Sequence, residues 1–157
     1  MTYSGDTAVI TVTPQKGGSY YGSADSRITD VSEKLRTVWR DNVPNARNFE
    51  SMKVARDGTE ELHITVTSPK ETRQLRKSGV DVTPITRGQF IVRPLGIGRV
   101  TDGDNEAWFI VFESPALQSA RREVGLPPKD LHATLGFAVK DIFTTPKTSE
   151  TIVNLEG

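Results

Sequence analysis

The sequence predicts an α+β fold with largely antiparallel sheets, because stretches with strand character outnumber those with helix character. Two repeated features add a prediction of two related lobes. A six-residue motif occurs at 61–66 and again at 130–135. It consists of an acidic residue, Leu, His, a small or aliphatic residue, Thr and an aliphatic residue. A Ser-Pro helix start closed by a later Gly also occurs twice, at 68–79 and 114–125. We therefore expect a bilobal domain whose two sheets face a central cleft, with helices outside.

Hydrophobic periodicity and turn residues assign the elements of the first half of the chain. β-branched runs indicate strands, apolar residues three or four apart indicate helices, and Gly and Pro mark breaks. By these criteria we expect a strand over 8–13, a Gly pair at 17–18, an aromatic stretch at 20–21, a helix over 29–40, a loop over 42–48, and a hairpin of 52–56 with 61–67 that turns at Asp57-Gly58.

The second half contains clearer helix signals. Ser68 is expected to cap a helix, because Glu71 completes a capping box, Pro69 occupies the first helical position and Gly79 suits the C-terminal cap. The other expected elements are strands over 80–85 and 90–100, a turn at 102–105, a strand over 108–113, a helix from 114 to 125 and a strand over 130–137. We expect residues 1–143 to form the domain and residues 144–157 a polar, poorly ordered tail.

Composition restricts the class of function. The chain has 157 residues, enough for one hydrophobic core, and no net charge, which argues against binding along duplex DNA. It lacks cysteine, which excludes disulfides and a thiol nucleophile, and its two histidines lack a clustered third ligand for zinc. No signal peptide or membrane-length apolar run is present. We expect a cytoplasmic monomer (host cytoplasm if viral) that requires no metal or cofactor and binds no membrane.

The two histidines carry the strongest functional signal. Side chains alternate faces along a strand, so His63 and Thr65 share one face, as do His132 and Thr134. Thr frequency alone gives both histidines a Thr two residues later in about one case in a hundred. Two such strands that face each other place two imidazoles and two hydroxyls in one cleft. The alternative is that each histidine is an unrelated, half-buried strand residue.

Paired imidazoles suit acid–base chemistry on a phosphate ester. An imidazole titrates near neutrality, so one can accept a proton while the other donates one. Hydroxyls two residues along can donate to phosphate oxygens and stabilise the charge of the transition state. The acid and base roles exchange when the linkage is read in the opposite direction, so the sequence does not assign them.

This pattern resembles the two-histidine (2H) phosphoesterase superfamily, over about Glu61 to Phe137 and including the Leu-Pro-Pro-Lys that precedes Asp130. The resemblance implies a bilobal, metal-independent enzyme with pseudo-twofold sheets. Known activities include hydrolysis of 2′,3′-cyclic phosphates, 2′–5′ oligonucleotide cleavage and RNA-end joining, and some phage members degrade cyclic oligonucleotides of bacterial immune signalling. By position, the acid–base pair would be His63 and His132, and the phosphate-binding residues Thr65 and Thr134.

Other residues are secondary candidates for substrate binding. Tyr20 and Tyr21 can stack on a base, although one core and one surface tyrosine would look the same. Arg93, near Arg87 and Arg99, can hold an anion or belong to a solvated sheet face. Lys129 can raise the positive potential near the second motif or be an exposed loop lysine. For Trp39 and Trp108 we expect packing.

These observations predict a metal-independent phosphodiesterase for an RNA-type or cyclic nucleotide linkage. The zero net charge favours a nucleotide or short oligonucleotide over a long polymer. Among these we favour a cyclic oligonucleotide of host antiviral defence or a short RNA. The alternatives are a 2′,3′-cyclic phosphodiesterase or RNA-end-joining enzyme, and a non-catalytic module that sequesters a nucleotide.

Overall fold

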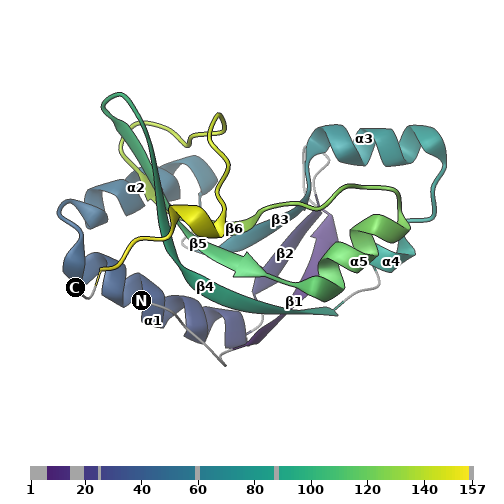
Figure 1. The fold of residues 1–157 in the computed structure, drawn as a ribbon, viewed down its shortest axis with the longest axis horizontal. Helices are drawn as coiled ribbons and strands as arrows, with labels where there is room; N and C mark the ends of the chain where they lie inside the picture. Colours follow the sequence, from purple (N-terminus) through teal and green to yellow (C-terminus); the bar gives the residue numbers. More distant parts are fainter. Residues whose placement is uncertain (1–6, 15–19, 25, 59–60, 87–88, 156–157) are drawn as a thin grey trace.

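The computed structural model describes residues 7–14, 20–24, 26–58, 61–86 and 89–155, and it confirms the α+β class (Figure 1). The strands are β1 (Ala8–Pro14), β2 (Tyr20–Ala24), β3 (His63–Thr67), β4 (Gln89–Asp102), β5 (Asn105–Glu113) and β6 (Leu131–Phe137). The helices are α1 (Ser26–Asn42), α2 (Ala46–Asp57), α3 (Pro69–Ser78), α4 (Thr83–Thr86), α5 (Pro115–Glu123) and a 3₁₀ turn, η1 (Ser149–Thr151).

The six strands form one antiparallel sheet in the order β3-β2-β1-β4-β5-β6. Strand β4 is shared: its first part, 89–92, pairs with β1, and its remainder, 93–102, pairs with β5. The arrangement of two separate sheets is therefore not confirmed. β3 and β6 are the two ends of this order, yet they contact each other, which shows that the sheet curls until its end strands meet (Figure 1).

The two faces of the sheet carry different apolar clusters. The larger cluster joins one face to the helices and contains Trp39, Ile64, Leu117, Ile110 and Ala133, with Trp108 among its other members. Both tryptophans are buried there, so their predicted packing role is confirmed. A smaller cluster lies on the opposite face and consists of Val100, Ala107, Phe109, Val111, Phe137 and Ile142.

The predicted loop over 42–48 is shorter, at 43–45 between α1 and α2, and the predicted strand over 52–56 is wrong, because this stretch belongs to the helix α2. The helix has a weak apolar pattern, since one of its buried positions is a lysine, Lys53. Its ammonium donates to the carbonyl of Glu61 over 2.9 Å and pairs with Asp57 over 3.2 Å. Gly58 has φ of 74° and caps the C-terminal end of the helix. The Asp57-Gly58 dipeptide therefore ends a helix and does not form the predicted hairpin turn.

The predicted strand over 80–85 is also wrong. The chain turns there and forms the four-residue α4, whose start is held by Asp81: its carboxylate accepts from the Thr83 backbone N–H and hydroxyl, each over 3.0 Å. A local side-chain cap therefore outweighs the strand propensity of Val80, Val82 and Ile85.

The two Ser-Pro helices form as predicted. Ser68 and Glu71 make a complete capping box at the start of α3, and the backbone N–H of Leu117 donates to the Ser114 hydroxyl at the start of α5. Gly79 has φ of 65° at the end of α3. The strands over 90–100, 108–113 and 130–137 are confirmed as β4, β5 and β6, with bounds a few residues different.

The segment 144–155, part of the predicted polar tail, contacts the domain: Val153 and Leu155 pack against the larger apolar cluster. Ile152 forms a β-bridge with Gly98, and its neighbour Val153 donates to the carbonyl of Ile97 over 2.9 Å. Lys147 is buried, and this polar residue becomes part of the site described below.

Candidate active site

The predicted alternation of side chains along both motif strands is confirmed. On β3, His63 and Thr65 are partly exposed, while Ile64 is fully buried in the larger core. On β6, Leu131 and Ala133 are buried in that same core, so the intervening His132 points to the other face. We call this face of β3 and β6 the histidine face.

The structure brings the two motifs together. β3 and β6 are in contact although they lie at opposite ends of the strand order. Burial lowers the pKa of both His63 and His132, and the carboxylate of Asp141, four residues beyond the end of β6, opposes this effect in each. The charge of Asp141 therefore acts on both imidazoles.

Asp141 is the centre of a buried hydrogen-bonded cluster. Its Oδ1 accepts from Lys147 Nζ over 2.7 Å and from the Ile142 backbone N–H over 2.9 Å. Its Oδ2 accepts from Arg56 Nη1 over 3.0 Å and from the Thr134 hydroxyl over 3.3 Å. Burial alone would raise the pKa of Asp141, but the hydrogen bonds and charges of Lys147 and Arg56 hold it below its usual value.

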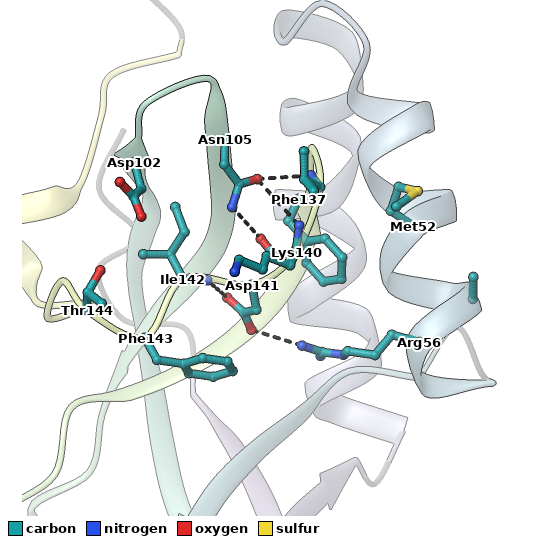
Figure 2. Close-up of a pocket in the computed structure, with 12 residues that line it drawn as sticks. Met52, Arg56, Asp102, Asn105, Phe137, Lys140, Asp141, Ile142, Phe143 and Thr144 are labelled. Atoms are coloured by element: carbon teal, nitrogen blue, oxygen red, sulfur yellow. Dashed lines mark hydrogen bonds and ion pairs between the residues drawn. The ribbon is translucent and has the colours of Figure 1, made fainter.

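Arg56 and Lys147 supply positive charge beside the histidines. Lys147 Nζ also lies 5.6 Å from the centre of the Phe109 ring. The Arg56 guanidinium lies 5.1 Å from the centre of the Phe137 ring, and Figure 2 labels both residues. The Lys147 ammonium has three hydrogens that it can donate, one of which goes to Asp141 Oδ1. The Thr134 hydroxyl has a single hydrogen, which it donates to Asp141. To donate to a phosphate, this hydroxyl must rotate away from Asp141.

Three residues of this cluster are not among the site residues predicted from the sequence: Arg56, Asp141 and Lys147. Arg56 and Asp141 are 85 residues apart, and only the packing of α2 near β6 brings them together. Arg56 was assigned to a strand and Lys147 to a poorly ordered tail. The one available signal was the sequence Asp-x₅-Lys just after the second motif, which is too short to indicate a site alone.

The ring of His132 contacts the aromatic ring of Phe109. The imidazole meets the edge of Phe109 at 5.8 Å between centroids, and its Nδ1 lies 3.4 Å from the carbonyl oxygen of Asp130. Burial, with repulsion from the Lys147 ammonium, lowers the pKa of His132 to about 4. In the free protein this imidazole is therefore neutral near pH 7 and able to accept a proton.

His63 has a more balanced surrounding of charges. Burial lowers its pKa below the usual value; the Asp57 carboxylate opposes this effect, and the Lys53 and Arg56 cations add to it. Asp57 is itself held in place by Arg56 Nε over 2.7 Å. Helix α2 thus sets the charge environment of the first histidine, while the segment after β6 sets that of the second.

The secondary candidates are spread over different parts of the molecule. Lys129 lines a cavity of about 320 Å³ together with His132 and Lys147, and burial lowers its pKa. Tyr20 lines a separate cavity against α3 that contains neither histidine. The Tyr21 backbone pairs with Thr65, and its side chain lies outside the described part of the structure.

Arg93 pairs with a carboxylate on the histidine face. Its guanidinium donates to Glu113 Oε1, and the two residues are also cross-strand partners in the β4–β5 ladder. Glu113 follows Val111 by two residues on β5, and Val111 is the cross-strand partner of His132. Arg93 therefore lies on the histidine face, as the predicted anion contact requires. Its positive charge is balanced there by the Glu113 carboxylate.

A second and larger cavity, of about 690 Å³, lies between α2 and the segment 137–144 (Figure 2). Arg56 and Asp141 line it, whereas neither histidine does. Ile142 and Phe143 line both this cavity and the one that contains His132. The two cavities thus lie on either side of this short segment.

Two other structural features bear on the class of protein: clusters of metal ligands and membrane-spanning helices. Within the described ranges, no group of three or more histidine, aspartate or glutamate side chains is arranged to hold a metal ion. Among the described helices, none is both long and apolar enough to cross a membrane.

Comparison with known proteins agrees with the arrangement of the two motifs. A family model described as "Swiss Army Knife, 2H phosphoesterase domain" matches residues 29–143. The match includes α2, both His-x-Thr strands and Asp141. No match was found among curated proteins or among solved structures. Because the family model covers well over half of the chain, this protein belongs to the 2H phosphoesterase superfamily.

Proposed function

We propose that this protein is a metal-independent phosphodiesterase in which His63 and His132 act as the acid–base pair. The observation that carries the proposal is the contact between the two His-x-Thr strands, the second of which is hydrogen-bonded to the Asp141 cluster through Thr134. Acid–base transfer between two imidazoles needs no metal ion for its proton steps. The 2H family match supports a phosphodiesterase type of activity.

The proposed reaction on a 2′,3′-cyclic phosphate uses each imidazole once. One neutral imidazole takes a proton from water as the water oxygen attacks phosphorus. The bond from phosphorus to one ribose oxygen breaks, and the second imidazole, protonated beforehand, gives its proton to that oxygen. The product is a ribose phosphate monoester. On an RNA-type linkage a 2′-hydroxyl replaces water as the nucleophile, and the departing group is a 5′-oxygen.

Arg56 and Lys147 are the proposed phosphate-binding cations, with Thr65 and Thr134 as hydroxyl donors. Arg56 and Lys147 are held by Asp141, and Lys147 acts on the charge of His132. A phosphate anion near the pair also favours the protonated form of an imidazole, which raises its pKa above that of the free protein. Substrate binding would therefore help to provide the protonated acid that the reaction requires.

The proposed substrates are small cyclic or RNA-type nucleotides. The zero net charge of the chain argues for a local anion site over a long basic groove. The cavities beside Asp141, about 320 and 690 Å³, have the size of small-molecule sites. Within this class we favour cyclic oligonucleotides, for which degradation would remove a signal of host antiviral defence.

A panel of substrates in the presence of EDTA tests the proposal. The panel contains 2′,3′-cyclic AMP, 2′–5′ and 3′–5′ oligoadenylate, and cyclic di- and trinucleotides, each incubated with the wild-type protein and with Arg122→Ala. Arg122 is an exposed cation on α5, so its variant is a control that should retain full activity.

We expect EDTA-resistant cleavage of at least one member, and the member cleaved fastest identifies the substrate class. Ligand recovered intact after binding would contradict the proposal and favour a sequestering module. Joined product from 2′,3′-cyclic phosphate and 5′-hydroxyl ends would instead indicate RNA-end joining.

A further inference from the structure

We propose that the cavity between α2 and residues 137–144 binds the base of the nucleotide substrate, with Phe143 as the ring on which the base stacks. This inference deepens the proposed function, on which it rests, by naming the part of the substrate that fills a specific cavity. The cavity has a volume of about 690 Å³. It is separate from the smaller cavity that contains His132.

The lining of this cavity is mainly apolar, and much of it is exposed. Met52, Val139 and Phe143 are 42%, 62% and 84% exposed. They account for three of the five large exposed apolar side chains in the described part of the chain. Such a concentration of exposed apolar side chains at one cavity is typical of a ligand site. Figure 2 shows Met52 on α2 and Phe143 on the segment opposite it.

Phe143 has the environment of a stacking platform. Lys147 Nζ lies 5.3 Å from the centre of the Phe143 ring. The Phe143 side chain is nevertheless mostly exposed. Aromatic side chains hold unpaired bases by stacking, and this mode tolerates any base because each has a π face. A buried ammonium beside the ring connects this platform to the Asp141 cluster.

The cavity adjoins the proposed phosphate site, because Ile142 and Phe143 line both this cavity and the one that contains His132. Arg56 and Asp141 line it, and Asp141 also accepts a hydrogen bond from Thr134 on the histidine face. Phe137, at the end of β6, lines the cavity three residues beyond Thr134. The β5–β6 register shifts between these residues, so that they face Phe109 and Ala107, two residues apart on β5. A strand rises about 3.3 Å per residue, so this distance is about 7 Å. That separation suits a nucleotide with its phosphate at the histidines and its base in the cavity.

The wall of the cavity is held in shape by Asn105. Its Oδ1 accepts from the Val139 backbone N–H over 2.9 Å, and its Nδ2 donates to the Lys140 carbonyl over 2.9 Å (Figure 2). These bonds tie the segment after β6 to the tip of the β4–β5 hairpin. Because its amide is occupied in this way, Asn105 supports the wall and leaves the apolar side chains to contact the base.

Binding measurements test the inference independently of turnover. The affinities for adenosine 3′-monophosphate and inorganic phosphate are measured by calorimetry for the wild type, Phe143→Ala, Phe143→Trp and Ile91→Ala. Ile91 is 60% exposed and does not line the cavity, so its variant is a matched control. Phe143 is exposed, so removal of its ring should leave the fold intact.

We expect Phe143→Ala to weaken adenosine 3′-monophosphate binding about five- to tenfold, the lower part of the range for one stacked base. Phosphate affinity should not change, Phe143→Trp should restore nucleotide affinity, and Ile91→Ala should match the wild type. Equal nucleotide affinity in the wild type and Phe143→Ala would overturn the inference. An equal loss of phosphate affinity in Phe143→Ala would overturn it as well.

A paired turnover assay separates the inference from the proposed function. It compares 2′,3′-cyclic AMP with the 2′,3′-cyclic phosphate of methyl riboside, which lacks a base. Phe143→Ala should lower kcat/KM for the first substrate and leave the second unchanged. If the wild type cleaves no member of the substrate panel, the proposed function fails, and the calorimetric result alone then decides whether the cavity binds a base.

Discussion

Asp141 and Lys147 form a buried ion pair in which Lys147 Nζ lies 2.7 Å from Asp141 Oδ1. Both side chains are about 95% buried, and Arg56 approaches the same carboxylate from α2. The pair links the segment after β6 to the second motif, because Asp141 also accepts a hydrogen bond from Thr134. Stability, the charge of the histidines and the position of the proposed phosphate-binding cations therefore depend on one carboxylate.

Replacement of this carboxylate should destabilise the protein strongly. Asp141→Asn leaves Lys147 buried beside a neutral group and weakens the tie to Arg56. Removal of one partner of a buried ion pair typically costs about 3–5 kcal/mol of unfolding free energy. Urea unfolding measures the effect, with the exposed Asp130→Asn as a control that should change stability by less than about 0.5 kcal/mol. Similar stability in the two variants would show that the Asp141 cluster is not a structural centre.

Lys147 should control the charge of His132. Its ammonium adds to burial in lowering the pKa of His132 to about 4, so Lys147→Gln should raise this pKa toward the usual value. The chain contains only two histidines, so NMR titration of their ring protons can follow each one separately. Lys140→Gln removes an exposed lysine near the same segment and should leave the His132 pKa unchanged. An unaltered His132 pKa in Lys147→Gln would contradict the position of the ammonium.

The pH dependence of kcat/KM should reflect the low pKa of both imidazoles in the free protein. The reaction needs one neutral and one protonated imidazole. As pH falls through about 4, His132 becomes protonated and is lost as a base; as pH rises through the lowered pKa of His63, the acid is lost. The profile should therefore be bell-shaped, with a maximum between about pH 4 and pH 6.5. A constant rate from pH 7 to 9 with no acidic maximum would contradict this assignment.

Gly136 should be essential for the position of α2. A Cβ atom at this residue would lie 2.6 Å from the carbonyl carbon of Phe49 and 2.7 Å from the nitrogen of Glu50, both in the backbone of α2. Gly136→Ala must therefore push the helix away, at a cost of about 1–3 kcal/mol, and shift Arg56 from Asp141. The midpoint temperature of thermal unfolding and kcat/KM should both fall in Gly136→Ala. Ser51→Ala, on the exposed side of α2, should alter neither. A fully active and stable Gly136→Ala would show that α2 need not pack this closely.

The sequence predicted the parts of the site that depend on local pattern. The alternation of His63 and Thr65 with Ile64 follows from strand geometry, and the structure bears it out. The Ser68 and Ser114 caps follow from short-range hydrogen bonds that any such sequence can form. These features involve residues within a few positions of one another, so the pattern contains the necessary information.

The rest of the site depends on tertiary packing. Helix α2 was missed because a lysine, Lys53, occupies a buried position where an apolar residue would have marked the helical period. Its ammonium is bound by the Glu61 carbonyl and the Asp57 carboxylate, and no short sequence pattern links these groups to Lys53. Without α2 in place, neither the Arg56–Asp141 contact nor the larger cavity could be predicted. The curl that joins β3 to β6 is likewise a property of the whole sheet.

The most direct test of the account is kcat/KM in EDTA for His63→Ala and His132→Ala, measured on the substrate that the wild type cleaves best. General acid–base catalysis typically contributes about 10²- to 10⁴-fold, so each variant should lose activity by about that factor. Arg122→Ala should match the wild type, and circular dichroism should show that both histidine variants remain folded. Near wild-type activity in either folded histidine variant would contradict the central claim that the two imidazoles form the catalytic pair.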